Sequence, residues 1–217
     1  FPANMDGELV LVGTAKARPF RNVWMLEELQ IPYTLMPAMP RSSEAMSLNP
    51  SGKVPILKHG DFTMTESAAI NTYLADTFRG SADLVPSSGQ LRGRYEELVQ
   101  CIMTELDAQG LWIHRKHEAM KQFFGHIPEA VQHAQQHFLN TLNILLARLH
   151  EEGEYLLGKF SAADILLVHC LDWATAIKWL PSTAIDSELR PVLEAYMQRC
   201  HQRDAYQRAV LTRKAKM

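Results

Sequence analysis

The first 80 residues alternate short apolar runs with one amphipathic segment. A compact β-type run covers Glu8–Val12, and the same type of pattern returns at Tyr33–Met36. Between them, Arg21–Gln30 carries apolar side chains at helical spacing. A strand, a helix and a second strand in this order predict two parallel strands joined by a right-handed crossover.

A turn and a second group of elements follow. The turn is Asn49–Gly52, and the apolar runs Val54–Leu57 and Phe62–Met64 come after it. The Gly-Asp pair between these two runs predicts a β-hairpin. A helix is expected to begin near Ser67, where apolar spacing becomes helical. The order β-α-β, then β-β-α, is that of a thioredoxin-like α+β domain.

The pattern changes after a polar, turn-rich stretch at residues 81–90, which we interpret as a linker. Through most of residues 91–217 apolar positions recur at helical spacing, and strand signals nearly vanish. We therefore expect an N-terminal domain at residues 5–80 and an all-α C-terminal helical bundle at residues 91–217. Residues 1–4 precede Met5 and are interpreted as a processing remnant.

The composition is that of a globular chain. Of its 217 residues, 47% are hydrophobic and 21% are charged, and the formal net charge is −2. This is enough apolar side chain for a sizeable core. A nearly neutral chain without a long basic stripe is not expected to bind nucleic acid. No apolar run approaches the roughly 20 residues that cross a bilayer, and no secretory signal pattern is seen, so we expect a cytoplasmic protein.

Cysteines and histidines give little sign of a disulfide framework or a metal site. Cys101, Cys170 and Cys200 are odd in number and far apart, which suits a reducing compartment. His133 and His137 have the spacing of helical metal ligands, but their segment is polar and lacks the Glu of a zinc-protease motif. We expect an exposed helix face there and no metal.

One helix start is unusually well marked. Ser161 and Asp164 resemble a capping box, and Phe160 and Ile165 are placed as a hydrophobic staple. We interpret this motif as a contribution to stability and folding rather than to chemistry.

Three motifs in order along the chain resemble one known family. They are Asn49–Leu57, Thr65–Asp76 and Gly158–Ile165. Together, at these separations, they resemble the cytosolic glutathione transferases, and the resemblance covers essentially Met5 to the C-terminus. It implies a thioredoxin-like domain followed by an all-α bundle, a homodimer, and a site in each subunit for glutathione as co-substrate.

The turn before the third strand suits the backbone of a tripeptide. An X-Pro bond favours the trans form by only about 0.5–1 kcal/mol. A cis Pro55 could therefore leave the N–H and C=O of Val54 unpaired, ready to bind an extended peptide as a neighbouring strand would. Lys53 and Arg41 could pair with the carboxylate at one end of the tripeptide. The alternative for Lys53 is a solvated turn residue.

The start of the following helix suits an α-amino acid, which is what a γ-glutamyl group presents. First-turn N–H groups and the Ser67 hydroxyl would face a carboxylate, and Glu66 could hold an ammonium. The alternatives are that Ser67 caps its own helix and that Glu66 is a favourable first-turn charge.

The segment after the first strand departs from the family pattern. Glutathione transferases activate the thiol with a Tyr, Ser or Cys near this point, because a thiol of pKa about 8.5 is mostly protonated at neutral pH. Ala17 occupies the usual Ser or Cys position. Thr14 lies nearer the Tyr position; alternatively the N–H or guanidinium of Arg18, or Lys16, supplies a positive field, or no side chain activates the thiol. Arg21 is expected to brace the fold.

The second substrate is expected to bind along the helix through Leu111–His117. Trp112 could stack on an aromatic electrophile, and Arg115 or Lys116 could favour an anionic one. The alternative places Trp112 in the core.

Because no cysteine precedes Cys101, the first domain has no thiol for a mixed disulfide.

These observations favour a detoxifying glutathione S-transferase. We expect it to stabilise the glutathione thiolate and add it to a small hydrophobic electrophile, or to reduce an organic hydroperoxide. Two alternatives from other classes stay open: a non-catalytic carrier of hydrophobic ligands, and a protein-interaction module such as a domain of a translation or signalling assembly.

Overall fold

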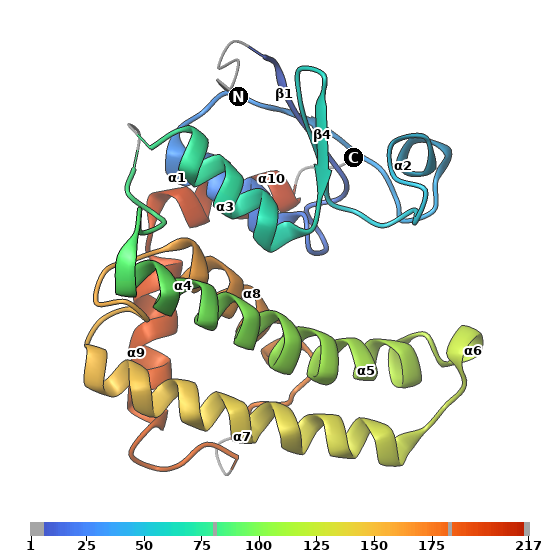
Figure 1. Cartoon of the computed structure of the whole chain (residues 1–217). Coiled ribbons are helices and arrows are strands. Elements are labelled where there is room, and N and C mark those ends of the chain that lie inside the picture. The colour runs from blue at the N-terminus through green and yellow to red at the C-terminus, as the bar shows by residue number, and fades with distance from the viewer. Residues whose placement is uncertain (1–6, 80–81, 182–183, 215–217) are drawn as a thin grey trace. The chain divides into compact units, whose positions relative to one another are not determined.

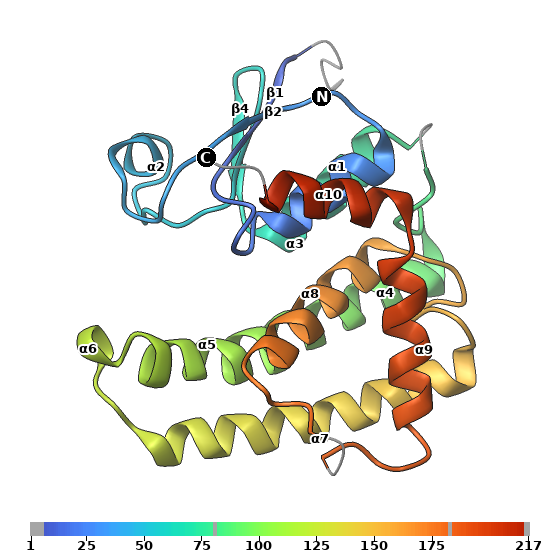
Figure 2. The ribbon, with the colours of Figure 1, turned by 180° about the vertical axis from the view of Figure 1, so that it is seen from behind.

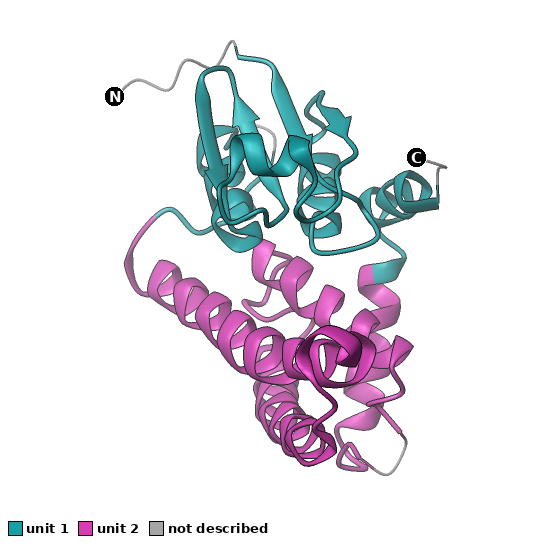
Figure 3. Ribbon diagram, turned by 90° about the vertical axis from the view of Figure 1, so that its right-hand side faces the viewer, with its two compact units in different colours: residues 1–87, 201–217 teal, residues 88–200 magenta. Residues whose placement is uncertain are grey.

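The computed structural model describes residues 7–79, 82–181 and 184–214 (Figure 1). Contacts divide the chain into two compact units, here called unit 1 (residues 1–87 and 201–217) and unit 2 (residues 88–200; Figure 3). This division differs from the sequence pattern, which groups residues 201–217 with the helical bundle. Residues 1–4, interpreted as a processing remnant, and residue 81 of the linker lie outside the described residues.

Unit 1 contains a four-stranded sheet with helices packed beside it. Its elements are β1 (Leu9–Val12), α1 (Phe20–Leu29), β2 (Thr34–Met36), α2 (Ser43–Leu48), β3 (Ile56–His59), β4 (Phe62–Thr65), α3 (Ser67–Thr77) and α10 (Asp204–Lys214).

The sheet has the order β2-β1-β3-β4, and only the β1–β2 pair is parallel among the described strands. Leu11 of β1 is paired with Leu35 on one side and with Leu57 on the other. Because β1 and β3 lie inside the sheet, Leu11 and Leu57 are fully buried. The predicted β-α-β and β-β-α order is confirmed, and α2 is an additional helix that the pattern did not predict.

The last helix of the chain, α10, packs against α1 and completes the core of unit 1 (Figure 2). The ring of Tyr206 lies edge-on to Trp24 at a centroid distance of 4.8 Å and to Phe20 at 5.8 Å. Just before α10, Arg203 forms a two-armed ion pair with Glu28, with Nε–Oε1 and Nη2–Oε2 distances of 2.6 and 2.7 Å. These contacts explain why residues 201–217 group with unit 1.

Unit 2 is helical, as the spacing of its apolar residues predicts. Its elements are α4 (Gly89–Cys101), the π-helix η1 (Ile102–Leu111), α5 (Trp112–His114), the π-helix η2 (Arg115–Ala119), α6 (Lys121–Phe124), α7 (Pro128–Glu152), α8 (Ala162–Ala176) and α9 (Arg190–His201). Helix α7 packs on η1, and α8 packs on both η1 and α4. Within the described ranges, we find no helix with the length and apolar character that a membrane span requires.

Helix α8 begins with the predicted capping box. The Asp164 side chain accepts hydrogen bonds from the N–H and the hydroxyl of Ser161, both at 2.8 Å. It also accepts from the N–H of Leu156 at 3.1 Å and from the phenol of Tyr196 at 2.9 Å. Burial raises the pKa of Asp164, and these hydrogen bonds oppose that shift. The motif therefore joins the start of α8 to α9 and to the preceding loop.

Candidate functional site

Gly13 brings three segments of unit 1 together at the end of β1. Its φ angle is +139°, and a Cβ at this position would lie 2.6 Å from Cγ of Pro19 and 3.1 Å from Cβ of Val54. The segment after β1, the start of α1 and the segment before β3 therefore meet at a point where only glycine fits. This role of Gly13 was not predicted, although a glycine directly after a buried strand is a signal for such a close approach.

The candidate thiol activators lie in the turn that follows Gly13. Thr14 is 5% exposed, and its Oγ1 accepts a hydrogen bond from the N–H of Lys16 at 3.1 Å. Its hydroxyl proton makes no hydrogen bond to any described residue, so the hydroxyl can still donate. Ala17 and Arg18 are half-buried and directly precede Pro19, the N-cap residue of α1.

The peptide unit at Val54 is open. The Val54–Pro55 bond is cis. The Val54 side chain packs on the apolar cluster around Val12 and Ile56, while its N–H and C=O make no hydrogen bond within the described part of the chain. The neighbouring carbonyl of Lys53, in contrast, accepts a hydrogen bond from Asn49 Nδ2 at 2.9 Å. An unpaired donor and acceptor on one residue are what an extended peptide can bind.

Two exposed cations lie on the segments that flank α2. The N–H of Arg41, before α2, donates to the carbonyl of Gly52 at 2.8 Å, which holds the backbone of Arg41 against the residue that precedes Lys53. Both residues are exposed, and neither side chain forms an ion pair with a described residue. The two segments therefore offer two positive charges near the open peptide unit of Val54.

Glu66 and Ser67 stand at the start of α3. Glu66 is exposed, has φ +69°, and is the residue before the helix, with no capping hydrogen bond from its side chain. Ser67 is the first helical residue and is 2% exposed. The alternative that Ser67 caps its own helix is therefore wrong. Instead, its Oγ accepts a hydrogen bond from Nη1 of Arg21 at 3.1 Å.

A buried polar layer joins α1 to the first turn of α3. Arg21 and Asn22 are both 0% exposed. Nδ2 of Asn22 donates to the carbonyl of Ser67 at 2.8 Å and to Oδ1 of Asn71 at 2.7 Å. Arg21 was expected to brace the fold, but its contact with Ser67 was not predicted. The signal was an Arg-Asn pair within an otherwise apolar helix face.

The candidates for the second substrate lie in unit 2. Trp112 and Lys116 are half-buried, and Arg115 is exposed. Between them in the chain, His114 lies edge-on to Trp179 at a centroid distance of 5.3 Å, and burial lowers its pKa. Trp112 is therefore neither fully buried, as the core alternative expects, nor fully exposed.

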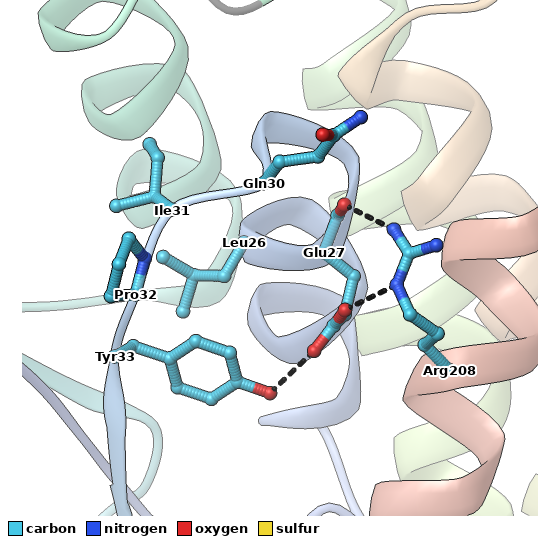
Figure 4. Close-up of a pocket in the computed structure, with 7 residues that line it drawn as sticks. All are labelled: Leu26, Glu27, Gln30, Ile31, Pro32, Tyr33 and Arg208. Atoms are coloured by element: carbon cyan, nitrogen blue, oxygen red, sulfur yellow. Dashed lines mark hydrogen bonds and ion pairs between the residues drawn. The ribbon is translucent and has the colours of Figure 1, made fainter.

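Unit 1 also contains a cavity of about 550 Å³, lined by residues other than the predicted site residues. It is lined by Leu26, Glu27, Gln30, Ile31, Pro32, Tyr33 and Arg208 (Figure 4). Within it, the Glu27 carboxylate accepts from Nε of Arg208 at 2.7 Å and from the phenol of Tyr33 at 3.1 Å. Burial and the charge of Glu27 raise the pKa of Tyr33 to about 12. The seven residues that line this cavity do not include any of the predicted glutathione-site residues, so the cavity is separate from the predicted site.

His133 and His137, the two histidines with the spacing of metal ligands, differ in their surroundings. His137 lies 2.8 Å from Glu105, with Nε2 facing Oε2, while His133 is exposed. Among the described residues, no group of three or more His, Cys, Asp or Glu side chains is placed to hold a metal ion.

Two family models match the sequence. The model described as "Glutathione S-transferase, N-terminal domain" matches residues 19–77, which contain the turn at Val54 and the start of α3. The model described as "Glutathione S-transferase, C-terminal domain" matches residues 128–199. Together the two matches span more than half of the chain.

Individual proteins that resemble this chain in sequence or structure are also glutathione transferases. Glutathione S-transferase 2 of Schizosaccharomyces pombe is 29% identical over 161 residues, which are 69% of this chain and 68% of that protein. A glutathione transferase of Populus trichocarpa superposes with a TM-score of 0.80 at 18% identity, over 95% of this chain and 100% of that chain. A glutathione transferase of Phanerochaete chrysosporium, crystallised with oxidized glutathione, has a TM-score of 0.78 at 23% identity, over 98% and 97% of the two chains.

Proposed function

Because this chain belongs to the glutathione transferase family, we propose that it binds glutathione in extended form across Val54 and uses its thiol as a nucleophile. The observation that carries this proposal is the open N–H and C=O of Val54, directly beside the Gly13–Thr14 turn. The oxidized glutathione in the Phanerochaete relative supports the choice of ligand.

Charged groups at both ends of the open peptide unit suit the termini of this tripeptide. Arg41 and Lys53 would bind one carboxylate, and their exposed, unpaired side chains are available for it. The first-turn N–H groups of α3 and the Ser67 hydroxyl would bind the γ-glutamyl carboxylate, with Glu66 facing the ammonium. Two carboxylates and one ammonium are the charges that glutathione carries at neutral pH.

The thiol would lie near the turn after β1. A hydroxyl that can still donate, on Thr14, and the guanidinium of Arg18 are the candidates for holding the thiolate. Each unit by which the thiol pKa is lowered requires about 1.36 kcal/mol of selective stabilisation of the thiolate. One good donor at Thr14 or a nearby cation at Arg18 is of that size.

We assign the second substrate to unit 2. Trp112 would stack on a small hydrophobic electrophile or an organic hydroperoxide, and Arg115 and Lys116 would favour an anionic one. A homodimer, a cytoplasmic location and a role in detoxification complete the proposal.

The test is calorimetry of glutathione binding, followed by turnover with chlorinated nitrobenzenes, isothiocyanates and organic hydroperoxides. We expect heat of association at millimolar glutathione or below, and turnover with at least one class of electrophile. A Lys53→Met, Arg41→Met double variant should bind glutathione more weakly, while Lys159→Met, an exposed lysine of unit 2, serves as the control. No heat and no turnover would overturn the proposal.

Ala17 favours a second candidate function. Because this position lacks a hydroxyl or thiol, a carrier of hydrophobic ligands that binds glutathione without turning it over would have the same binding groups. Calorimetric binding without turnover of any electrophile would select the carrier.

A further inference from the structure

The buried guanidinium of Arg21 lies directly behind the proposed carboxylate site. Arg21 is 0% exposed, although an arginine side chain stays charged at any pH at which proteins fold. Its Nη1 donates to Oγ of Ser67, the first residue of α3. A buried charge that contacts a site residue changes the electrostatics of that site, because the low dielectric of the interior screens it weakly.

The hydrogen bond from Arg21 determines what the Ser67 hydroxyl can do. A hydroxyl has one proton to donate and lone pairs to accept. At Ser67 a lone pair is occupied by the guanidinium, whereas the proton makes no hydrogen bond to any described residue. Donation from a cation polarises the O–H bond, so the hydroxyl becomes a stronger donor to an anion.

The backbone of the first turn of α3 is held from the same side. Asn22, the next residue of α1, donates to the carbonyl of Ser67 and is itself linked to Asn71 one turn further along α3. Two adjacent residues of α1 thus fix both the hydroxyl and the main chain of Ser67. Such a pair aligns the first-turn N–H groups and the hydroxyl before any ligand arrives, which lowers the ordering cost of binding.

We infer that Arg21 is a positioning residue for glutathione, which acts through Ser67 to make this chain select the α-carboxylate of the γ-glutamyl group. The inference rests on the proposed function. It extends that function because Arg21 itself does not touch the ligand: it sets the donor direction and the positive potential of the groups that do.

The experiment compares glutathione with an analogue whose γ-glutamyl α-carboxylate is a primary amide. The preference is the ratio of the two dissociation constants, with the KM and kcat for glutathione measured alongside. We expect the wild type to prefer glutathione, and Arg21→Met to lose about tenfold or more of that preference, mainly through KM. Arg21→Lys, which keeps the charge, should restore part of it.

Two further variants separate positioning from bracing. In a Ser67→Ala background, Arg21→Met should remove little additional preference, since the two residues act on the same carboxylate. Arg203→Met disturbs the packing of α1 at Glu28 without contacting Ser67, so it should lower stability and leave the preference unchanged. If Arg21→Met does not fold, Arg21→Lys in the wild-type and Ser67→Ala backgrounds provides the same comparison.

The outcomes are distinguishable. A wild type that binds neither compound refutes the proposed function. A wild type that binds both equally, or a folded Arg21 variant that keeps the full preference, refutes the role of Arg21 while leaving glutathione binding in place.

Discussion

The phenol of Tyr196 donates a 2.9 Å hydrogen bond to the buried carboxylate of Asp164. The two residues stand on α9 and in the first turn of α8, so the bond joins two helices of unit 2. Tyr196→Phe should lower the free energy of unfolding by about 1.5–3 kcal/mol, because it removes one donor from a charged group. Asp164→Ala should cost more, since it leaves the N–H groups of Leu156 and Ser161 without an acceptor. Urea denaturation measures both, and Glu129→Gln, at an exposed residue of α7, is the control. Equal stability of Tyr196→Phe and the wild type would contradict the prediction.

Two ion pairs between the same segments offer a matched comparison. Glu28 is 7% exposed and paired with Arg203, whereas Arg208, 44% exposed, pairs with Glu27. Arg203→Met removes the countercharge of a buried carboxylate, which keeps its hydrogen bond from Nε1 of Trp24, and should cost about 2–4 kcal/mol. Arg208→Met should cost less than about 1 kcal/mol, because solvent screens the more exposed pair. Urea midpoints at low and high salt measure the difference, and comparable losses for both variants would contradict it.

Ionisation of the Tyr33 phenol should lower the stability of the protein at alkaline pH. Its pKa is about 12 in the folded protein, above the ordinary value of 10.0. The folded state therefore holds this proton more tightly than the unfolded state. The resulting stability is fully present below pH 10 and is lost as the pH rises towards 12.

Between pH 9 and 11, about the range in which an ordinary tyrosine begins to ionise, the urea midpoint of the wild type should fall more steeply than that of Tyr33→Phe. Burial also raises the pKa of Tyr196, so ultraviolet titration should show a late-ionising phenol in both proteins, and one more such phenol in the wild type than in Tyr33→Phe. If the urea midpoints of the two proteins fall equally with pH, the burial of Tyr33 and its contact with Glu27 do not contribute to stability in this pH range.

Gly13→Ala should harm both stability and the proposed site. The added Cβ would meet Cγ of Pro19 at 2.6 Å, in a backbone conformation that other residues rarely adopt. We expect a loss of about 2–4 kcal/mol and weaker glutathione binding, because the turn at Thr14 would move away from Val54. Gly93→Ala is the matched control: nothing lies within 4 Å of its Cβ position in α4, and it should stabilise the helix by about 0.5–1 kcal/mol. Normal binding by a stable Gly13→Ala variant would show that the close approach is dispensable.

The thiol activator can be identified by titrating bound glutathione. Thr14→Val keeps the shape of the side chain and removes its hydroxyl, so it should raise the pKa of the bound thiol by about one unit if Thr14 is the donor. Thr14→Ser keeps a hydroxyl and should keep most of the effect. Arg18→Met tests the other candidate. Thiolate absorbance against pH gives each value, and a titration unchanged by Thr14→Val would discard that residue.

The local elements of this fold were readable from sequence because their signals are local. The compact apolar run of β1, the Gly60 hairpin and the capping box at Ser161 each depend on a few neighbouring residues. Helix α2 was missed because it is short, with one buried residue, Ala45. The grouping of α10 with unit 1 depends on contacts such as that of Tyr206 with Trp24, two residues separated by more than half of the sequence. The apolar spacing of a helix predicts that one face is buried, but it does not predict which element packs on that face.

The candidate site also combines residues predicted from local motifs with a contact that depends on packing between helices. Lys53, Val54, Glu66 and Ser67 belong to motifs that a linear pattern displays. The contact of Arg21 with Ser67 could not be predicted, since it depends on how α1 packs on α3. An arginine at the base of an apolar helix indicates only that some buried partner exists.

The return of α10 to unit 1 also has a consequence for biosynthesis. Trp24 and Phe20 are made early, whereas Tyr206, which covers them, is among the last described residues to be translated. The nascent first unit therefore emerges from the ribosome with an uncovered aromatic face and must wait for the whole of unit 2 to be synthesised. During that interval the face is a natural substrate for chaperones, and ribosome stalling anywhere in unit 2 would prolong its exposure.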